Sequence, residues 1–142
     1  MESLRFTNGA DCFEMAIAVE EDRSLPSYED ACANVAVQSQ GFNGRSHCWI
    51  SKSELQEFCR GLIILENARN GTTSLHSMSP GDLSVRIFSV SSLGHLAIQG
   101  VVGRHVLIHR GGFPHSISFG FEFDPSQLAA AVRLDWVRRY GV

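Results

Sequence analysis

Lysine is nearly absent from this sequence: of the 12 basic residues, Lys52 is the single lysine and the others are arginines. No G-x-x-x-x-G-K-[ST] motif surrounds Lys52, so the chain lacks a phosphate-binding loop of that type. The 15 acidic residues outnumber the basic ones and give a net charge of −3. Proteins that bind nucleic acid need clustered Lys and Arg to displace counterions from the phosphates. We therefore expect no direct contact with nucleic acid.

Long hydrophobic runs are also missing, because apolar stretches such as residues 61–65 are far shorter than the ~20 residues of a membrane helix. Residues 1–10 include Glu2, Arg5 and Asn8, so we expect no signal peptide and no membrane association. Hydrophobic residues make up 44% of the 142-residue chain, which argues against disorder. The sequence predicts a cytoplasmic protein with a single domain over residues 1–142.

Cysteine occurs at positions 12, 32, 48 and 59, without any Cys-x-x-Cys pair. Without a secretory signal, this spacing argues against a disulfide framework. Cys59 falls within an amphipathic helical pattern, where a free cysteine usually packs into the core. We expect reduced thiols that serve mainly as packing residues.

Two segments carry helix signals. Ser51 and Glu54 have the spacing of a capping box, and apolar residues then recur at helical spacing: Leu55, Phe58, Cys59, Leu62 and Leu65. Asn70-Gly71 is typical of a left-handed stop, so we predict a helix over about residues 52–69 that packs against a sheet. The second helix is expected to begin at Asp124-Pro125, with Asp124 as the cap and Pro125 in the first helical position.

Most of the remaining sequence has the period-two alternation of β-strands. It is strongest at residues 117–123, and further strands are expected at 4–7, 13–20, 33–39, 83–87 and 95–102, with a hairpin loop at 91–94. Residues 104–112 are expected to form a strand that runs into a glycine turn. Hairpin-length connections imply antiparallel pairing, because parallel neighbours need crossovers of a dozen or more residues. We predict an α+β fold: a single antiparallel β-sheet with one helix inserted midway and a C-terminal helix packed on one sheet face.

None of the six histidines lies in a recognisable catalytic motif. His105 and His109 are four residues apart, but on a strand this spacing separates the side chains by roughly 13 Å, too far for one zinc ion. We expect no metal site, and no role is assigned to the segment that continues to His115. An enzyme would require His95, His115 or Cys48 to converge in a cleft with perturbed pKa values. We predict no enzyme activity, no catalytic residue and no cofactor.

Acidic residues gather in one stretch, interrupted by Arg23, which contains Glu20, Glu21, Asp22, Glu29 and Asp30. One interpretation is a solvated loop, and the other is a patch for a basic protein, since complementary charge accelerates association. Phe42, inside the glycine-bounded segment 41–44, and Trp49 are aromatic anchors if they are exposed, and core residues if they pack under the loop. Together these residues are the candidate partner-binding site.

Several short motifs occur in a defined order. They are Gly41-Phe42-Asn43-Gly44, Leu55-Gln56-Glu57-Phe58 with Leu62 and Leu65-Glu66, Gly71, Leu75-His76-Ser77-Met78-Ser79-Pro80-Gly81-Asp82-Leu83, Leu93-Gly94-His95-Leu96 with Gly100, and Phe119-Gly120-Phe121-Glu122-Phe123-Asp124-Pro125-Ser126-Gln127-Leu128. In order and spacing the set resembles the small bacterial WapI-type immunity proteins, which are encoded beside contact-dependent or secreted polymorphic toxins. The resemblance covers about residues 30–132. The acidic stretch and the histidines at 105, 109 and 115 are not part of its motifs.

The resemblance implies binding rather than catalysis, because such proteins block a cognate toxin, often a nuclease, by occluding or distorting its active site. It also implies an antiparallel sheet with a helix inserted midway and another at the C-terminus. The negative net charge suits a basic toxin domain as the partner. A non-catalytic ligand-binding or subunit module, with a groove between helix and sheet, is the alternative. Exposed sheet edges also leave a homodimer open.

Overall fold

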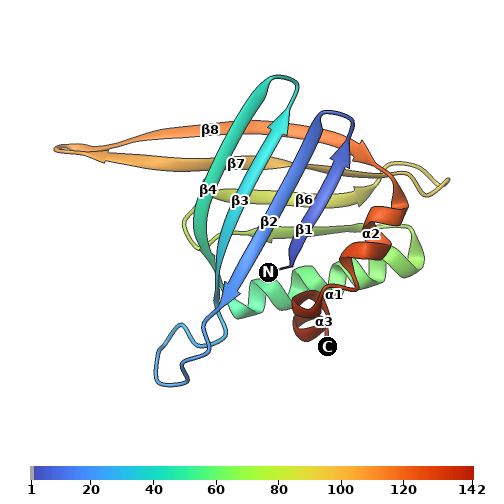
Figure 1. Cartoon of the computed structure of the whole chain (residues 1–142), viewed down its shortest axis with the longest axis horizontal. Coiled ribbons are helices and arrows are strands. Elements are labelled where there is room, and N and C mark those ends of the chain that lie inside the picture. The colour runs from blue at the N-terminus through green and yellow to red at the C-terminus, as the bar shows by residue number, and fades with distance from the viewer. Residues whose placement is uncertain (1) are drawn as a thin grey trace.

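The chain forms two antiparallel sheets of four strands in a computed structural model, which describes residues 2–142. In each sheet every strand pairs with the next one along the chain. The first sheet consists of β1 (Ser3–Asn8), β2 (Asp11–Val19), β3 (Ala31–Ser39) and β4 (Phe42–Ile50). The second consists of β5 (Thr72–His76), β6 (Leu83–Ser89), β7 (Leu96–Ile108) and β8 (Gly111–Phe123). Figure 1 shows the strands of one sheet crossing those of the other.

The predicted single sheet is therefore wrong. The strands pair antiparallel as expected, but they divide into two sheets at α1 (Lys52–Ala68), which stands between β4 and β5 in the chain. A helix of this length advances roughly 25 Å, too far for the strands on either side to form a hairpin. Period-two alternation looks the same whether a helix or a second sheet buries the apolar face, so the pattern does not separate the two architectures.

The core lies between the sheets, where alternate residues of each strand point inward. Phe13 of β2 is fully buried and stacks on Phe119 of β8, with ring centroids 5.8 Å apart. Phe6 of β1 meets Phe123 of β8 at 4.3 Å. These ring contacts join the first sheet to the second, so the phenylalanines of residues 117–123 pack against a sheet rather than under a helix.

Strands β4 and β5 are the two that the sequence pattern does not reveal. β5 is short, and the inward positions of β4 before Ile50 carry small or polar side chains, such as Gly44 and Ser46. Packing accounts for the glycine, because a Cβ atom there would lie 3.0 Å from Cγ1 of Ile117 in β8. The expected loop at 41–44 is instead a tight β3–β4 turn, with positive φ at Gln40 and Gly41, followed by the start of β4.

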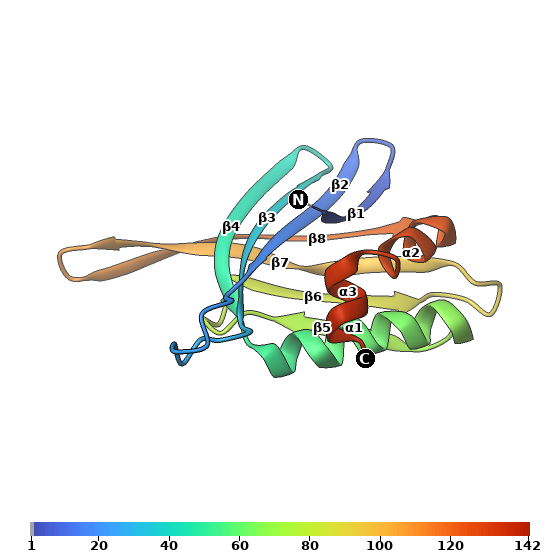
Figure 2. The same cartoon turned by 60° about the horizontal axis from the view of Figure 1, so that its bottom comes forward.

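Helix α1 agrees closely with the prediction, since its buried residues are the five expected ones, Leu55, Phe58, Cys59, Leu62 and Leu65. The hydroxyl of Ser51 caps the helix by accepting a hydrogen bond from the backbone N–H of Glu54 (3.3 Å). The helix ends at Ala68, one residue before the predicted end, and Arg69 adopts the left-handed conformation. α1 lies along β5 and closes one side of the space between the sheets (Figure 2).

The predicted C-terminal helix is two short helices, α2 (Pro125–Ala131) and α3 (Asp135–Tyr140). Its start is confirmed, since Asp124 accepts the backbone N–H of Ser126 (2.8 Å) and Pro125 is the first helical residue. α2 packs on β1 and α3 packs on α1, so the pair lies at the border between the first sheet and α1 rather than across one sheet face. Within residues 2–142, no helix is long and apolar enough to cross a membrane.

Candidate partner-binding surfaces

The acidic stretch forms the loop between β2 and β3, and we call residues 20–30 the acidic loop. It projects from the lower end of the first sheet in Figure 1. The N–H of Glu20 donates to the carbonyl of Asp30, and the N–H of Glu29 donates to the carbonyl of Glu20, both at 2.9 Å. Tyr140 of α3 donates its hydroxyl to the carbonyl of Glu29 (2.7 Å). The base of the loop is therefore closed and fixed to α3.

Two of its acidic residues hold the start of α1. Glu29 forms an ion pair with Lys52, and this partner lowers the pKa of the Glu29 carboxyl. Asp30 accepts the backbone N–H of Lys52 (2.8 Å), one of the free donors at the helix N-terminus. Because both contacts support α1, loss of either charge would disturb the fold as well as an interface.

The other three acidic residues are closer to solvent. Glu21 pairs with Arg139 of α3 (2.9 Å), although 66% of its side chain is exposed. Asp22 accepts hydrogen bonds from the hydroxyl and the N–H of Ser24, which lower the pKa of its carboxyl. Glu20 accepts the N–H of Asp22 (3.0 Å). Among residues 2–142, no basic side chain lies within ion-pair distance of Glu20 or Asp22, so these two hold the uncompensated charge.

Phe42 and Trp49 lie at opposite ends of β4. Phe42 follows the β3–β4 turn and is 62% exposed, whereas Trp49 is 41% exposed on the outer face of the first sheet. Along the strand, the seven residue steps from Phe42 to Trp49 span roughly 23 Å. Trp49 pairs with Cys32, just after the acidic loop, so Trp49 is the aromatic residue beside that loop. Of the candidate partner-binding residues, Trp49 and those of the acidic loop therefore form one cluster, and Phe42 lies apart from it.

The residues of the enzyme alternative lie apart. Cys48 points into the core, and burial raises the pKa of its thiol to about 11. His95 precedes the first residue of β7, while His115 pairs with Arg104 near the far end of the β7–β8 pair. These three side chains do not share a cleft, so the geometry that this alternative required is not present.

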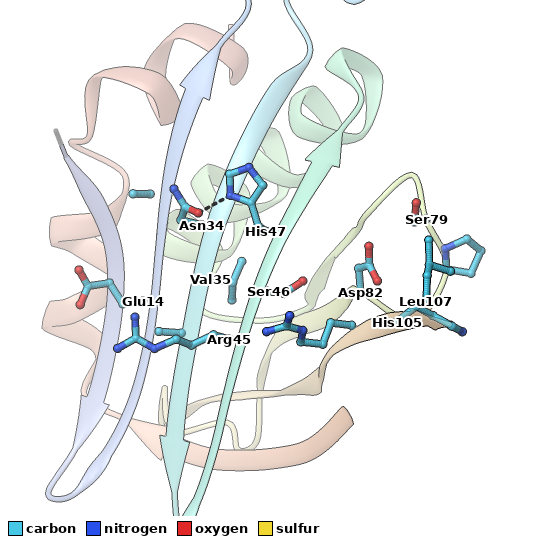
Figure 3. Close-up of a pocket in the computed structure, with 14 residues that line it drawn as sticks. Glu14, Asn34, Val35, Arg45, Ser46, His47, Ser79, Asp82, His105 and Leu107 are labelled. Atoms are coloured by element: carbon cyan, nitrogen blue, oxygen red, sulfur yellow. Dashed lines mark hydrogen bonds between the residues drawn. The ribbon is translucent and has the colours of Figure 1, made fainter. Parts of the chain in front are cut away.

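A different cysteine and histidine meet on the outer face of the first sheet. Sγ of Cys32 lies 3.0 Å from Nε2 of His47. Nδ1 of His47 bonds to Oδ1 of Asn34, as Figure 3 shows. With its Nδ1–H donated to Oδ1 of Asn34, His47 accepts a hydrogen bond from the thiol of Cys32 at Nε2. Partial burial raises the pKa of Cys32, which keeps it a thiol rather than a reactive thiolate. Cys48 is next to His47 in the sequence, but alternation along the strand points its side chain to the opposite face. The cysteine that contacts His47 is Cys32, on the neighbouring strand β3.

An open hollow of about 800 Å³ lies beside this trio. The outer face of β2, β3 and β4 forms one wall, and the β5–β6 loop with the distal part of β7 forms the other (Figure 3). The lining mixes charges, with Arg45, Arg104 and His105 against Glu14 and Asp82. The ligand-binding alternative placed its groove between helix and sheet, but buried side chains of α1 fill that space.

The distal part of the β7–β8 hairpin, residues 104–116, forms a projecting ribbon that we call the arm. β6 pairs with β7 only as far as Val102, and beyond that point the described ladder joins β7 to β8 alone. Figure 1 shows the arm extending past the edges of both sheets. Every residue of the arm whose side chain is described is exposed. The expected strand that enters a glycine turn is confirmed, but its exposed apolar side chains were missed. Val106 and Phe113 continue the alternation of a core strand, whereas Leu107 lies on the other face.

The three histidines of the arm are spread over it. His105 pairs with Pro114 and His115 with Arg104, so His105 and His115 point to opposite faces, while His109 lies in the turn. In the described part of the chain, no three His, Cys, Asp or Glu side chains form a group that could hold a metal ion.

Comparison with known proteins identifies the family of this chain. The sequence matches the immunity protein WapI-like family over residues 5–134. No curated protein and no solved structure matches the chain. The family match begins in β1 and ends between α2 and α3, so it includes both sheets and all of α1. Because it covers nearly the whole chain, the protein belongs to the WapI-like immunity protein family.

Proposed function

We propose that this protein binds a cognate bacterial toxin in the cytoplasm and neutralises it by protein–protein contact, without catalysis. The observation that carries the proposal is the family match over both sheets and α1. The toxin that we expect is basic, because the net charge of this chain is −3 and the acidic loop is its most acidic segment. A nuclease is the toxin class that best meets this requirement, since it needs a basic surface for the nucleic-acid backbone.

The acidic loop with Trp49 is the proposed contact for that basic surface. Glu21 and Asp22 are exposed, and Trp49 presents an aromatic side chain at the same end of the first sheet. Glu29 and Asp30 act mainly by holding the loop on α1. Phe42 contacts the toxin if the toxin interface extends from Trp49 along β4.

Co-purification tests the function. The tagged protein is captured from the bacterium that encodes it, washed at ~0.15 M salt, where surface charges still act over about 8 Å, and its partner is identified by mass spectrometry. The expected partner is the C-terminal domain of a large secreted or contact-delivered toxin, and co-expression with this protein should restore growth of a sensitive strain. A recovered toxin domain that kills cells equally well with and without the protein would show that the proposal is wrong.

A charge-neutral variant of the acidic loop tests the contact. Glu20→Gln with Asp22→Asn keeps the hydrogen-bond acceptors of the loop and removes the two charges that lack a cationic partner. We expect slower association with the recovered toxin domain and a weaker dependence on salt, because steering by charge is lost. Stopped-flow association rates at two salt concentrations measure this effect.

The matched control is Glu57→Gln with Glu122→Gln, two exposed acidic residues outside the loop. This variant removes the same number of charges, so the net charge changes equally. Equal rates for the loop variant and the control would rule out the loop as the toxin contact while leaving the immunity function in place.

A further inference from the structure

The arm presents apolar side chains to solvent on both of its faces. Val106 and Phe113 are partners across the ribbon, on the face that continues the core side of the second sheet, and they are 40% and 58% exposed. Leu107 lies on the other face and is 81% exposed, opposite Gly112, which has no side chain to cover it. The ribbon therefore keeps large apolar side chains on both faces in the region where it has left the core.

These side chains add little to the stability of the folded chain. Two-stranded ribbons are marginal by themselves, and burial of apolar surface is what stabilises a sheet. An exposed pair of strands is also prone to aggregation, which natural sheets usually avoid with charged residues or proline at the edge. The arm carries Arg104, Arg110 and Pro114 of this kind and still leaves large apolar side chains exposed. Burial against another molecule would account for Leu107 and Phe113 at these positions.

The charge of the arm indicates which kind of surface can bind it. The arm contains Arg104 and Arg110 together with its three histidines, and no acidic residue occurs between Asp82 and Glu122. Guanidinium groups bind carboxylates with two parallel hydrogen bonds, and a ribbon without carboxylates meets no repulsion from an acidic surface. Since the ribbon projects from the molecule, a cleft can enclose both of its faces (Figure 1).

We propose that the arm inserts into the acidic active-site cleft of the toxin, where carboxylates otherwise hold divalent metal ions. This inference rests on the proposed function and names the site on the toxin that the arm occupies. Metal-dependent nucleases combine a carboxylate cluster with a basic surface for the nucleic-acid backbone. The arm and the acidic loop project from the same side of the molecule in both Figures 1 and 2, so one partner can meet the two opposite charges.

A second copy of this chain is the competing occupant, because its acidic loop is an acidic surface. Contacts within the chain disfavour that pairing. Glu29 is paired with Lys52, Glu21 with Arg139, and Asp30 with the first N–H of α1. Three of the five acidic side chains of the loop are therefore already engaged within the chain, and only Glu20 and Asp22 are left to attract the arm of another copy.

Charge reversal on the arm is the first test. Arg104→Glu with Arg110→Glu should lower the affinity for the toxin domain recovered by co-purification by at least about 100-fold, because carboxylates would then face carboxylates. The control, Arg133→Glu with Arg138→Glu, makes the same charge change at exposed positions near the C-terminus and should keep the affinity within about threefold. MgCl2 added at constant ionic strength should weaken binding of the unmodified protein, because the metal competes for the same carboxylates.

Removal of the apolar anchors is the second test. Leu107→Ser with Phe113→Ser should reduce affinity by at least about tenfold and leave the urea midpoint of unfolding unchanged, since neither side chain is in the core. Val90→Ser with Leu93→Ser is the matched control in the loop at the other end of β7, where both side chains are exposed. This control should bind as the unmodified protein does.

The outcomes separate the two proposals. If the unmodified protein does not bind the toxin domain, both the proposed function and the arm inference are wrong. If it binds and neutralises the toxin while the arm variants bind equally well, or MgCl2 has no effect, the function stands and the arm inference is overturned. If the arm variants only convert a dimer to a monomer in sedimentation, the arm binds a second copy, which also overturns the inference.

Discussion

Glu54 connects the first turn of α1 to the end of β5. Its carboxylate accepts hydrogen bonds from the backbone N–H and from Nδ1 of His76, both at 2.8 Å. In a complete capping box the Glu54 side chain would accept the backbone N–H of Ser51. Only the other bond of the box is present, in which the backbone N–H of Glu54 donates to the Ser51 hydroxyl. One carboxylate thus positions the helix start against the second sheet, a role that depends on a partner 22 residues away.

At the same scale, the four thiols are expected to react at two different rates. Burial raises the pKa of Cys48 to about 11 and that of Cys59 to about 12, so each forms little of the reactive thiolate near neutral pH. Cys12 and Cys32 are only partly buried and should be alkylated before Cys48 and Cys59, although the raised pKa of the Cys32 thiol slows its reaction. Time-resolved labelling with iodoacetamide, read by mass spectrometry, measures the order, and a urea-unfolded sample should show all four reacting together. Native labelling of Cys59 as fast as Cys12 would contradict the packing described above.

At the scale of elements, α1 approaches β5 so closely that one helical position excludes a side chain. A Cβ atom at Gly61 would collide with the side chain of Thr73, whose hydroxyl donates to the carbonyl of Phe58 (3.1 Å). Glycine inside a helix costs about 1 kcal/mol relative to alanine. The close contact between α1 and β5 offsets that cost.

Gly61→Ala should therefore destabilise the protein by about 1–3 kcal/mol, because overpacking outweighs the better helix propensity of alanine. Urea denaturation of the variant and the unmodified protein measures the difference in unfolding free energy. Glu57→Ala, at an exposed position on the same helix, is the control and should change stability little. A more stable Gly61→Ala variant would show that α1 and β5 are not in this close contact.

Another element-scale feature concerns the outer edge of β1. The side-chain amide of Gln127 in α2 accepts the backbone N–H of Thr7 (2.7 Å) and donates to its carbonyl (2.8 Å). A neighbouring antiparallel strand would form the same pair of bonds. Gln127 therefore occupies a place where a second copy would otherwise extend the sheet, which disfavours a homodimer formed through β1.

At the scale of the whole molecule, burial links stability to alkaline pH. Burial raises the pKa of Cys48 and Cys59 above the ordinary 9.0 to about 11 and about 12, and that of Tyr140 above 10.0 to about 12. The unfolded chain therefore loses these protons at lower pH than the folded protein does. Their contribution to stability is complete below about pH 9 and is lost as pH rises towards 11–12.

The urea midpoint should accordingly fall between about pH 8 and about pH 10.5, with full recovery when the sample returns to the lower pH. Circular dichroism at each pH follows the transition. Tyr140→Phe, which cannot ionise, should show a shallower decline above pH 10 from a lower starting stability, because it also loses the hydrogen bond to Glu29. A midpoint that is constant or rises over this range would contradict the burial of these groups.

The sequence by itself determined the features that depend on neighbours in the chain. These include the five buried residues of α1, the Asp124 cap, the alternation at 117–123 and the family. Only the tertiary structure decided that there are two sheets, because alternation marks an apolar face without showing what covers it. It also decided which acidic side chains are compensated, since Lys52 and Arg139 lie far along the chain from Glu29 and Glu21. The exposure of the arm was likewise decided by the tertiary structure. Phe113 keeps the alternation of a core strand, but it is exposed because β6 pairs with β7 only as far as Val102.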